Sequence, residues 1–505
     1  MALARSWSVA LLGVAGHVIE VEADLAQGLP GTHIVGLPDA SLSEARDRVR
    51  AAVVNSGEAW PSNKITLGLS PATLPKHGSA FDLAVAAAIL TAAGSAPKDR
   101  LGKLVLLGEL GLDGRVRPIR GVLPAVLAAA RAGFVEAVVP RANVPEAQLV
   151  PGTTVHGVSS LAALLALLRG EEETPPDPPT DPAVVQARRP DLCEVVGQEL
   201  GRAAIEVAAA GGHHLWMLGP PGAGKTMLAE RLPGVLPPLS VDEALEVTAV
   251  HSVAGMLPPG SPLVHDPPFQ APHHSASMAA LVGGGSHVAR PGALSLAHRG
   301  VLFIDEAPEF PAGVLDALRQ PLERGEVVLA RSGGVVRYPA KVQLVVAANP
   351  CPCGSPRVDG CSCSPAARRR YLTRLSGPLL DRIDLQIQLP PVRAAAVHAD
   401  ADGLERSAPV RQRVIAARAA AAERWASQLW RLNAEAPGPA LRQRWRLPRP
   451  VTATADRMIE IGELTARGYD RVLRIGWTLA DLGGRTSPTA YDIDAAVCLR
   501  TGRTL

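Results

Sequence analysis

The residues best suited to chemistry lie in a glycine-rich turn. Residues 215–230 read LWMLGPPGAGKTMLAE, an apolar run, then glycines, then an amphipathic stretch. The pattern G-x-x-x-x-G-K-[ST] is typical of a loop whose backbone N–H groups surround phosphate oxygens. A helix that begins there adds unpaired N–H groups and the positive end of its dipole. The alternative is a glycine turn that matches by chance, but the full match with a strand before and a helix after favours a phosphate-binding loop.

Individual positions of this loop have expected roles. Lys225 would reach the β- and γ-phosphates of a nucleotide, and the Thr226 hydroxyl would bind Mg²⁺. Residues 301–306, VLFIDE, form an apolar strand that ends in two carboxylates. We expect Asp305 to hold Mg²⁺ through water and Glu306 to activate the attacking water. The predicted ligand is therefore ATP with Mg²⁺, bound by Gly219, Pro220, Pro221, Gly222, Ala223, Gly224, Lys225, Thr226 and Asp305.

These motifs belong to a chain long enough for several domains. At 505 residues, two to four domains are expected. The composition, 47% hydrophobic and 20% charged, is that of a globular protein, and a net charge of +3 gives no global field for nucleic acid, so any such surface must be local. No apolar run reaches the roughly 18 residues that a membrane helix needs. The N-terminus resembles a strand more than a signal peptide, so we expect a cytoplasmic protein without a membrane partner.

The order of apolar runs divides the chain into domains. Over residues 1–169, β-rich runs alternate with alanine-rich helices near 82–93 and 122–132, which predicts an α/β domain. Residues 170–190 contain three consecutive glutamates and six prolines, which predicts a linker. We place the ATPase core at 191–395 and a helical domain at 396–505.

Two segments of the N-terminal domain carry a resemblance to Lon proteases. They are PKHGSAFDLAVA at 75–86 and GELGLDGRVRPIRGVLPAVLAAARAGFVEAVVPRAN at 108–143. Where Lon has its serine nucleophile this chain has Ala80, and where Lon has its lysine base this chain has Leu123. Because the nucleophile and base are both missing, we expect a structural or assembly domain and no protease activity.

Four more blocks extend the pattern over the chain: FQAPHHSAS at 269–277, GALSLAHRGVLFIDE at 292–306, NPCPCG at 349–354 and SGPLLDRIDL at 376–385. With the phosphate loop, they resemble the bacterial Mg-chelatase-like AAA+ ATPases of the YifB/ComM type. The resemblance implies an α/β P-loop AAA+ core with a helical lid, preceded by an α/β Lon-protease-like domain. It also implies a hexameric, ATP-driven motor that promotes branch migration of DNA during recombination and natural transformation.

The resemblance also implies roles for single residues. Asn349 ends the apolar strand VQLVVAAN in the place of sensor 1, which contacts the γ-phosphate or the attacking water; a turn-forming asparagine is the alternative. Arg382 takes the place of an arginine finger that acts on a neighbouring subunit, with Arg374 as the competing choice. Arg467 is the sensor 2 candidate and Arg471 the second, with a solvated arginine face as the alternative. The expected catalytic residues are Glu306, Asn349, Arg382 and Arg467.

Residues 322–341 predict a hairpin, because β-prone runs flank a Ser-Gly-Gly turn. Related ATPases point such a hairpin into the pore of a ring, so Arg331, Arg337 and Lys341 are the candidate DNA contacts. Only 16 residues are aromatic (7 Trp, 4 Tyr and 5 Phe), which favours binding to the phosphate backbone over base stacking. The arginines of 368–374 are a further basic run, for which subunit interfaces are an equally good explanation.

Four cysteines form the pattern C-P-C-x7-C-S-C: Cys351, Cys353, Cys361 and Cys363. In a reducing compartment such a cluster suggests a metal before a disulfide. Four thiolates suit a closed tetrahedral Zn²⁺ site, although C-x-C is tighter than the usual spacing, and four unbridged thiols are the alternative. We expect His273 and His274 to lie in a loop that contacts nucleotide or DNA.

Together these features predict a DNA-dependent ATPase that assembles as a homo-oligomeric ring and moves single-stranded or branched DNA. The leading alternative is a chelatase-type or chaperone-like ATPase that remodels a protein partner. Lack of stimulation by DNA would favour that alternative.

Overall fold

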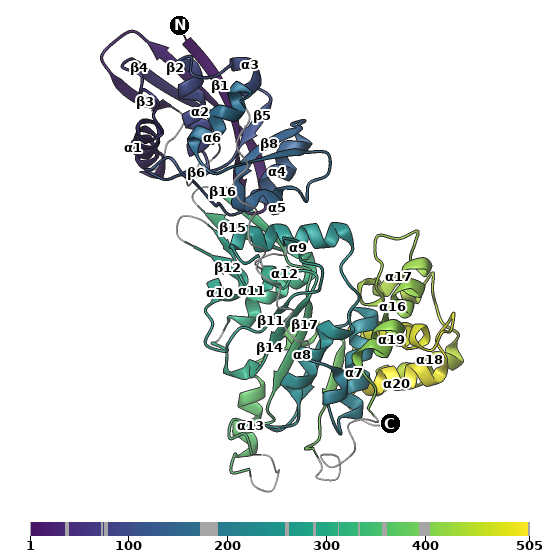
Figure 1. The fold of residues 1–505 in the computed structure, drawn as a ribbon. Helices are drawn as coiled ribbons and strands as arrows, with labels where there is room; N and C mark the ends of the chain where they lie inside the picture. Colours follow the sequence, from purple (N-terminus) through teal and green to yellow (C-terminus); the bar gives the residue numbers. More distant parts are fainter. Residues whose placement is uncertain are drawn as a thin grey trace.

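The computed structural model describes residues 2–35, 40–71, 74, 79–171, 190–257, 262–285, 289–311, 313–331, 334–355, 361–392 and 404–502. An N-terminal α/β part, a central α/β part and a C-terminal group of helices follow one another along the chain (Figure 1). Most of the predicted linker, residues 172–189, lies outside the described residues.

The N-terminal part is built on a seven-stranded mixed sheet with the order β3-β4-β2-β1-β5-β8-β9. Its strands are β1 (Ala2–Leu12), β2 (Ala15–Ala26), β3 (Gly31–Val35), β4 (Lys64–Ser70), β5 (Leu104–Leu106), β8 (Glu136–Pro140) and β9 (Thr154–Val158). A separate small hairpin pairs β6 (Glu109–Leu110) with β7 (Val116–Arg117). The helices are α1 (Ala40–Asn55), α2 (Asp82–Ala92), α3 (Lys98–Leu101), α4 (Val122–Arg131), α5 (Val144–Ala147) and α6 (Leu161–Arg169).

Helix α2 is the centre of this part, and all of its residues are buried. Its alanines allow the helix to lie close to β1 and β2. The buried carboxylate of Asp82 accepts two hydrogen bonds from Arg48, at 2.6 and 3.0 Å, so the charge is paired. Leu123, at the position of the Lon base, is also buried, and its backbone N–H donates to Glu146.

The central part is built on a five-stranded parallel sheet with the order β11-β14-β17-β10-β18. Strands β14 and β17 are buried throughout, as parallel strands covered on both faces are. Because the strands are parallel, the loops after β10, β14 and β17 meet at one edge. The strands are β10 (Leu215–Leu218), β11 (Phe269–Gln270), β14 (Val301–Ile304), β17 (Gln343–Ala348) and β18 (Leu385–Gln388).

Helices cover both faces of this sheet. The α-helices of the central part are α7 (Glu199–Gly211), α8 (Lys225–Val235), α9 (Val241–Ala254), α10 (Met278–Val282), α11 (Ala293–Leu296), α12 (Arg319–Arg324), α13 (Pro365–Leu372) and α14 (Gly377–Leu380). Short strands β12 (Gly283–Gly284) and β13 (Arg290–Pro291) pair with each other. One apolar cluster packs α7, α8 and the C-terminal helices against the sheet. A second apolar cluster includes residues of the sheet, of α10 and α11, and of the segment 327–338.

The predicted hairpin is present as β15 (Glu326–Arg331) and β16 (Gly334–Pro339). It meets the N-terminal part, because Gly13 forms a backbone bridge with Arg337. A Cβ on Gly13 would lie 2.7 Å from the Arg337 carbonyl oxygen, and its φ of +69° also requires glycine. Helix α4 packs on α9, where Ser252 donates to the Glu146 carboxylate. The N-terminal part therefore docks on α9 and on the hairpin (Figure 1).

The C-terminal part consists of helices packed around Trp425, which is fully buried. The rings of Trp430, Trp445 and Trp477 lie with their centroids 4.8–6.3 Å from that of Trp425. Helix α19 packs against α7 of the central part. The α-helices are α16 (Ser407–Arg424), α17 (Gly438–Arg442), α18 (Arg449–Glu460), α19 (Ala466–Leu482) and α20 (Ala490–Thr501).

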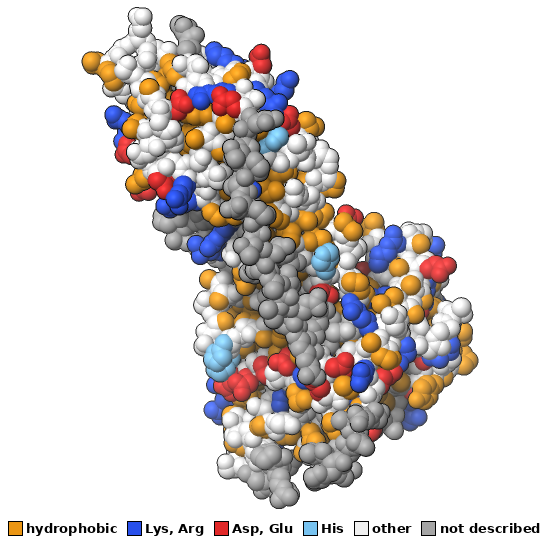
Figure 2. Space-filling view, viewed as in Figure 1, with side chains coloured by type: hydrophobic (Ala, Val, Ile, Leu, Met, Phe, Trp, Pro, Cys, Tyr) orange, Lys and Arg blue, Asp and Glu red, His pale blue; other side chains and the backbone are white. Residues whose placement is uncertain are grey.

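The surface carries charges of both signs. Figure 2 shows basic and acidic side chains interspersed on the visible face, instead of one basic field. In the described parts of the chain, we find no helix that combines the length and the apolar character needed to span a membrane.

Candidate nucleotide site

The glycine-rich loop joins β10 to α8 and has the backbone that its sequence predicts. Gly222 and Gly224 have φ values of +75° and +82°, in the left-handed region that glycine adopts without strain. Gly224 is the residue before α8, so the helix begins at Lys225. The Gly219 N–H donates to the Ala348 carbonyl of β17 over 3.2 Å and ties the loop to the neighbouring strand.

Lys225 is buried between the loop and the end of β17. Its Nζ donates to the carbonyl oxygens of Gly219 and Pro220, at 2.6 and 2.9 Å, and to Asn349 Oδ1 at 3.0 Å. Burial lowers the pKa of Lys225, and the charges of Asp305 and Glu306 oppose that shift. The structure thus brings together the predicted phosphate lysine and the predicted sensor 1 residue.

Thr226 and Asp305 are also brought together. The Thr226 hydroxyl donates to Asp305 Oδ2 over 2.8 Å, and Asp305 Oδ1 accepts from the Glu306 N–H over 2.9 Å. A hydroxyl and a carboxylate are hard oxygen ligands of the kind that Mg²⁺ prefers. These two residues therefore fit the predicted Mg²⁺ site.

Glu306 combines an unusual backbone with an unexpected partner. Its φ of +48° lies in the left-handed region, where a residue other than glycine is strained, as is frequent at functional sites. His274 Nδ1 lies 3.1 Å from Glu306 Oε2, and the rings of His273 and His274 lie 4.0 Å apart. His274 reaches this position because β11, just before it, pairs with β14. The sequence pointed to the His-His loop but not to Glu306 as its partner.

The arginine candidates Arg382, Arg467 and Arg471 lie at the opposite edge of the sheet. They lie around residues 381–384, which precede the amino end of β18. The phosphate loop follows the carboxyl end of β10, and β10 and β18 are parallel neighbours. These arginines therefore lie away from the phosphate loop of their own chain. Their partners are Glu323 for Arg382, Asp381 at 3.9 Å for Arg467, and Asp384 at 2.6 Å for Arg471.

Arg374, the competing finger candidate, lies elsewhere. Its NH1 donates to the Pro308 carbonyl over 3.1 Å and is 3.8 Å from Glu309 Oε2. Pro308 and Glu309 lie two and three residues after Glu306, so Arg374 lies on the same side of the sheet as Glu306 of its own chain. The two finger candidates are therefore on different edges of the sheet.

The candidate DNA contacts on the hairpin do not form one free basic surface. Arg337 NH1 is paired with Glu326 Oε1 at 2.6 Å. Lys341 lies beyond the hairpin, with its side chain beside Gly325. The Arg331 side chain lies outside the described residues.

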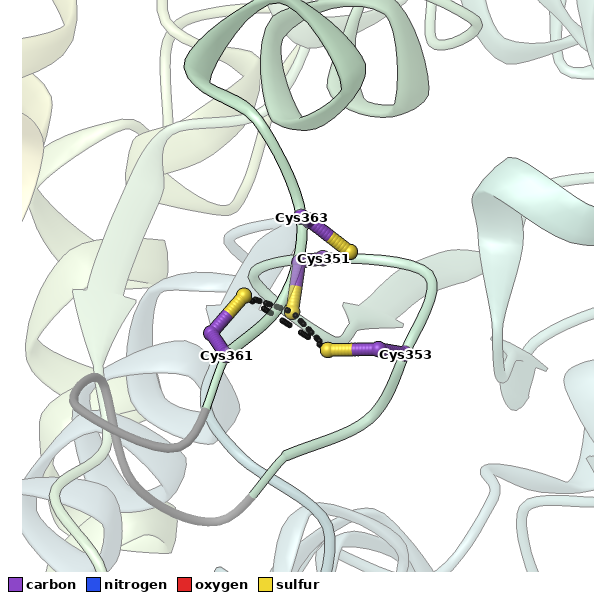
Figure 3. A group of neighbouring side chains, drawn as sticks. All are labelled: Cys351, Cys353, Cys361 and Cys363. Carbon is purple, nitrogen blue, oxygen red and sulfur yellow. Dashed lines mark hydrogen bonds between the residues drawn. The ribbon is translucent and has the colours of Figure 1, made fainter.

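The four cysteines converge on one point (Figure 3). Their sulfur atoms all lie within 4.8 Å of one another, and the shorter separations are 3.2 Å for Cys351–Cys353 and 3.5 Å from Cys361 to each of these. A tetrahedral Zn²⁺ site with Zn–S bonds of about 2.3 Å requires S–S separations of about 3.8 Å. A hydrogen bond from the backbone N–H of Ser355 lowers the pKa of Cys353 to about 6, whereas burial raises the pKa of Cys351 to about 12. The cluster fits Zn²⁺.

This cysteine loop lies against the nucleotide site. Cys351 follows Asn349 by two residues, and a Cβ on Gly354 would lie 3.4 Å from the Pro221 side chain in the phosphate loop. On its other side, Cys363 leads directly into α13 and then to Arg374. The loop thus contacts or adjoins two parts of the predicted ATP site.

Comparison with known proteins bears on the family. Residues 191–397 match the family described as magnesium chelatase, subunit ChlI; residues 21–143 match subunit ChlI of Mg-chelatase, and residues 404–500 match its C-terminal family. The protein YifB of Escherichia coli is 41% identical over 501 residues, which cover 99% of this chain and 97% of YifB. The competence protein ComM of Haemophilus influenzae is 40% identical over 491 residues, covering 96% and 94%. The chain belongs to the YifB/ComM family of Mg-chelatase-like AAA+ ATPases.

Other matches agree with this assignment. A protein of Mycobacterium tuberculosis is 56% identical over 500 residues, 99% of each chain. The N-terminal region also shows a partial likeness, 28% identity over 172 residues, to the Lon protease of Salinispora arenicola, covering 32% of this chain and 22% of that protease. The predicted family and the α/β AAA+ fold are confirmed. Membership of the YifB/ComM family implies ATPase activity with ATP and Mg²⁺.

Proposed function

We propose that this YifB/ComM-family protein is a DNA-dependent ATPase that works as a homohexameric ring. The observation that carries the proposal is the division of the catalytic groups between two edges of one sheet. Lys225, Thr226 and Glu306 lie at the carboxyl edge, and Arg382 lies at the amino edge. An arginine so placed reaches a nucleotide only from an adjacent copy, so a complete site needs two chains.

The DNA substrate is supported by one relative of the chain. ComM, 40% identical to this chain, is a competence protein. We propose that this chain acts on single-stranded or branched DNA, promoting branch migration in recombination and natural transformation. With a net charge of only +3, binding would depend on local contacts to phosphates and would weaken steeply with salt.

One observation favours the second candidate, an ATPase that remodels a protein. Arg337, in the hairpin of β15 and β16 that is the candidate DNA contact, forms a backbone bridge with Gly13. Its side chain is already paired with Glu326. A hairpin held in this way would transmit ATP-driven motion to the Lon-like domain. In that case, the substrate would be a protein bound by that domain.

We also propose that the four cysteines hold one structural Zn²⁺ ion. Four thiolates leave no open position for catalysis, so the ion would act by fixing the loop between Asn349 and α13. This would hold the sensor 1 asparagine and Pro221 in place around the triphosphate.

The experiment that separates the two functions measures ATPase rate against protein concentration. It is done without DNA and with single strands, duplex or a four-way junction, at low and moderate salt. A cooperative rise with concentration and further stimulation by single-stranded or branched DNA would support the DNA motor. A cooperative rise that is indifferent to every DNA would keep the ring and move the substrate to protein. Lys225→Ala serves as the control without nucleotide binding, and Glu306→Gln as the control that binds ATP without hydrolysing it.

A further inference from the structure

A cavity of about 570 Å³ lies at the amino ends of the strands of the five-stranded sheet. On the core side it is lined by residues that directly precede strands, among them His214 before β10 and Gly300 before β14. On the other side it is lined by Arg418 of α16 and Arg474 of α19. Because a four-residue strand spans about 13 Å, this cavity is distinct from the phosphate loop at the far edge.

The lining carries more positive than negative charge. Seven arginine and lysine side chains and four carboxylates line the cavity. Three of the carboxylates are already in ion pairs with three of the arginines, and the fourth, Glu435, accepts hydrogen bonds from backbone N–H groups. The ion pairs are Arg299–Glu243, Arg382–Glu323 and Arg471–Asp384.

Four cations are left without a carboxylate: Arg324, Lys341, Arg418 and Arg474. Within the described residues, none of them has an ion pair. Arg418 and Arg474 are partly buried, and each donates its Nε to one backbone carbonyl over 2.8 Å. Burial lowers the pKa of Arg418 to about 10 and also lowers the pKa of Arg474, although carboxylates farther away oppose both shifts: Glu243 and Glu435 for Arg418, and Asp384 and Asp470 for Arg474. Neither guanidinium has a carboxylate in direct contact, so each keeps N–H donors for a ligand that supplies an anion.

We propose that this cavity binds a small phosphate-bearing anion, of the size of an oligophosphate or a nucleotide, between the ATPase core and the C-terminal helices. Lys341 and Arg324 contact it from the core, and Arg418 and Arg474 from the helices. The volume is in the range of sites that bind small ligands. Such an anion joins the two parts of the chain by charge-assisted hydrogen bonds and stabilises one arrangement of them.

Binding would also affect the ring, a consequence that rests on the proposed function. Arg382 and Arg471 line the same cavity. A bound anion attracts both away from Glu323 and Asp384 and so changes the arginine face offered to the adjacent subunit.

The test uses the full chain carrying Lys225→Ala, without Mg²⁺, so that the phosphate loop does not contribute. Tripolyphosphate is the probe, and its affinity is measured by calorimetry in dilute protein that is kept monomeric. We expect saturable binding that Arg418→Gln and Arg474→Gln each weaken at least tenfold. Arg457→Gln, an exposed arginine of α18 outside the cavity, is the matched control and should bind as tightly as the parent.

Two further variants test the proposal if Arg418 or Arg474 is necessary for folding. Arg324→Ala and Lys341→Ala are exposed positions and should each weaken binding several-fold. Affinity that is the same in all variants, or that appears only in the assembled ring, would overturn the assignment. So would a short oligonucleotide that displaces tripolyphosphate with the same residue dependence, because the cavity would then be a DNA contact. A failure of DNA to stimulate ATP hydrolysis would leave this binding unaffected.

Discussion

His274 Nδ1 lies 3.1 Å from Oε2 of Glu306, and this contact joins the loop after β11 to the residue expected to activate water. Glu306 is about half exposed and its backbone is strained, so its carboxylate depends on neighbours for its orientation. His274 is therefore a positioning residue whose effect should fall on the chemical step.

Replacing His274 with alanine should lower kcat for ATP hydrolysis by about tenfold, or about 1.4 kcal/mol in the barrier. The dissociation constant of a non-hydrolysable ATP analogue should stay unchanged, because His274 contacts Glu306 and not the phosphate loop. His274→Asn, whose amide can still donate to Glu306, should recover part of the rate. A loss of analogue affinity equal to the loss of rate would show that the histidine binds nucleotide instead.

Arg382 should act on the ATP of the adjacent chain. We expect Arg382→Ala to lower the ATPase rate by about 10³-fold in an assembled ring, since an arginine finger has effects of that size. Mixing it with Lys225→Ala should restore part of the activity, because at some interfaces an intact phosphate loop meets an intact Arg382. Mixing it with the Lys225→Ala, Arg382→Ala double variant is the control and should restore nothing. If Arg374→Ala shows this behaviour and Arg382→Ala does not, the finger is Arg374.

The cysteine cluster should carry about one zinc ion per chain, measured by elemental analysis of protein purified without chelator. Cys353→Ser should lose the metal and lower Tm by about 5 °C, which corresponds to roughly 2 kcal/mol in a domain of this size. It should also weaken ATP binding, because the cluster lies between Asn349 and α13 and beside Pro221. Cys498→Ser, a free cysteine of α20 outside the cluster, is the matched control. Metal content near zero in the parent protein would remove the zinc proposal.

His214 should make the protein sensitive to mild acid. Burial lowers the pKa of His214 to about 4, and its Nδ1 accepts a hydrogen bond from the Leu344 N–H over 3.0 Å. The folded pKa lies below the value of 6.5 for an unperturbed histidine, so protons bind preferentially to the unfolded chain. Neutral His214 contributes fully to the free energy of unfolding above about pH 6.5, and this contribution is lost as the pH falls toward 4. The loss is about 2 kcal/mol at pH 5.

His214→Asn keeps an acceptor for Leu344 and cannot titrate. The free energy of unfolding is measured in urea by fluorescence. Between pH 7 and pH 5 it should fall by about 2 kcal/mol less in His214→Asn than in the parent. His17→Asn, at an exposed position, should follow the parent at both pH values. Identical pH dependence in the parent and His214→Asn would contradict the prediction.

The sequence by itself determined the local parts of the ATP site. The phosphate loop, the strand ending at Asp305 and Glu306, and the strand ending at Asn349 are contiguous patterns. Their structure depends on neighbouring residues: positive φ at Gly222 and Gly224, and buried apolar runs for the strands. The same holds for the hairpin after residue 325 and for the spacing of the four cysteines.

Only the tertiary structure decided which distant residues meet. Strand order is set by packing across the whole sheet, and no local pattern records it. It puts β11 beside β14 and so His274 beside Glu306, and it puts Arg382 at the edge opposite Lys225. The docking of Gly13 on the hairpin and the meeting of Arg418 and Arg474 with Lys341 likewise join segments far apart in the chain. These contacts depend on the sum of many long-range interactions, so they become visible only once the chain is folded.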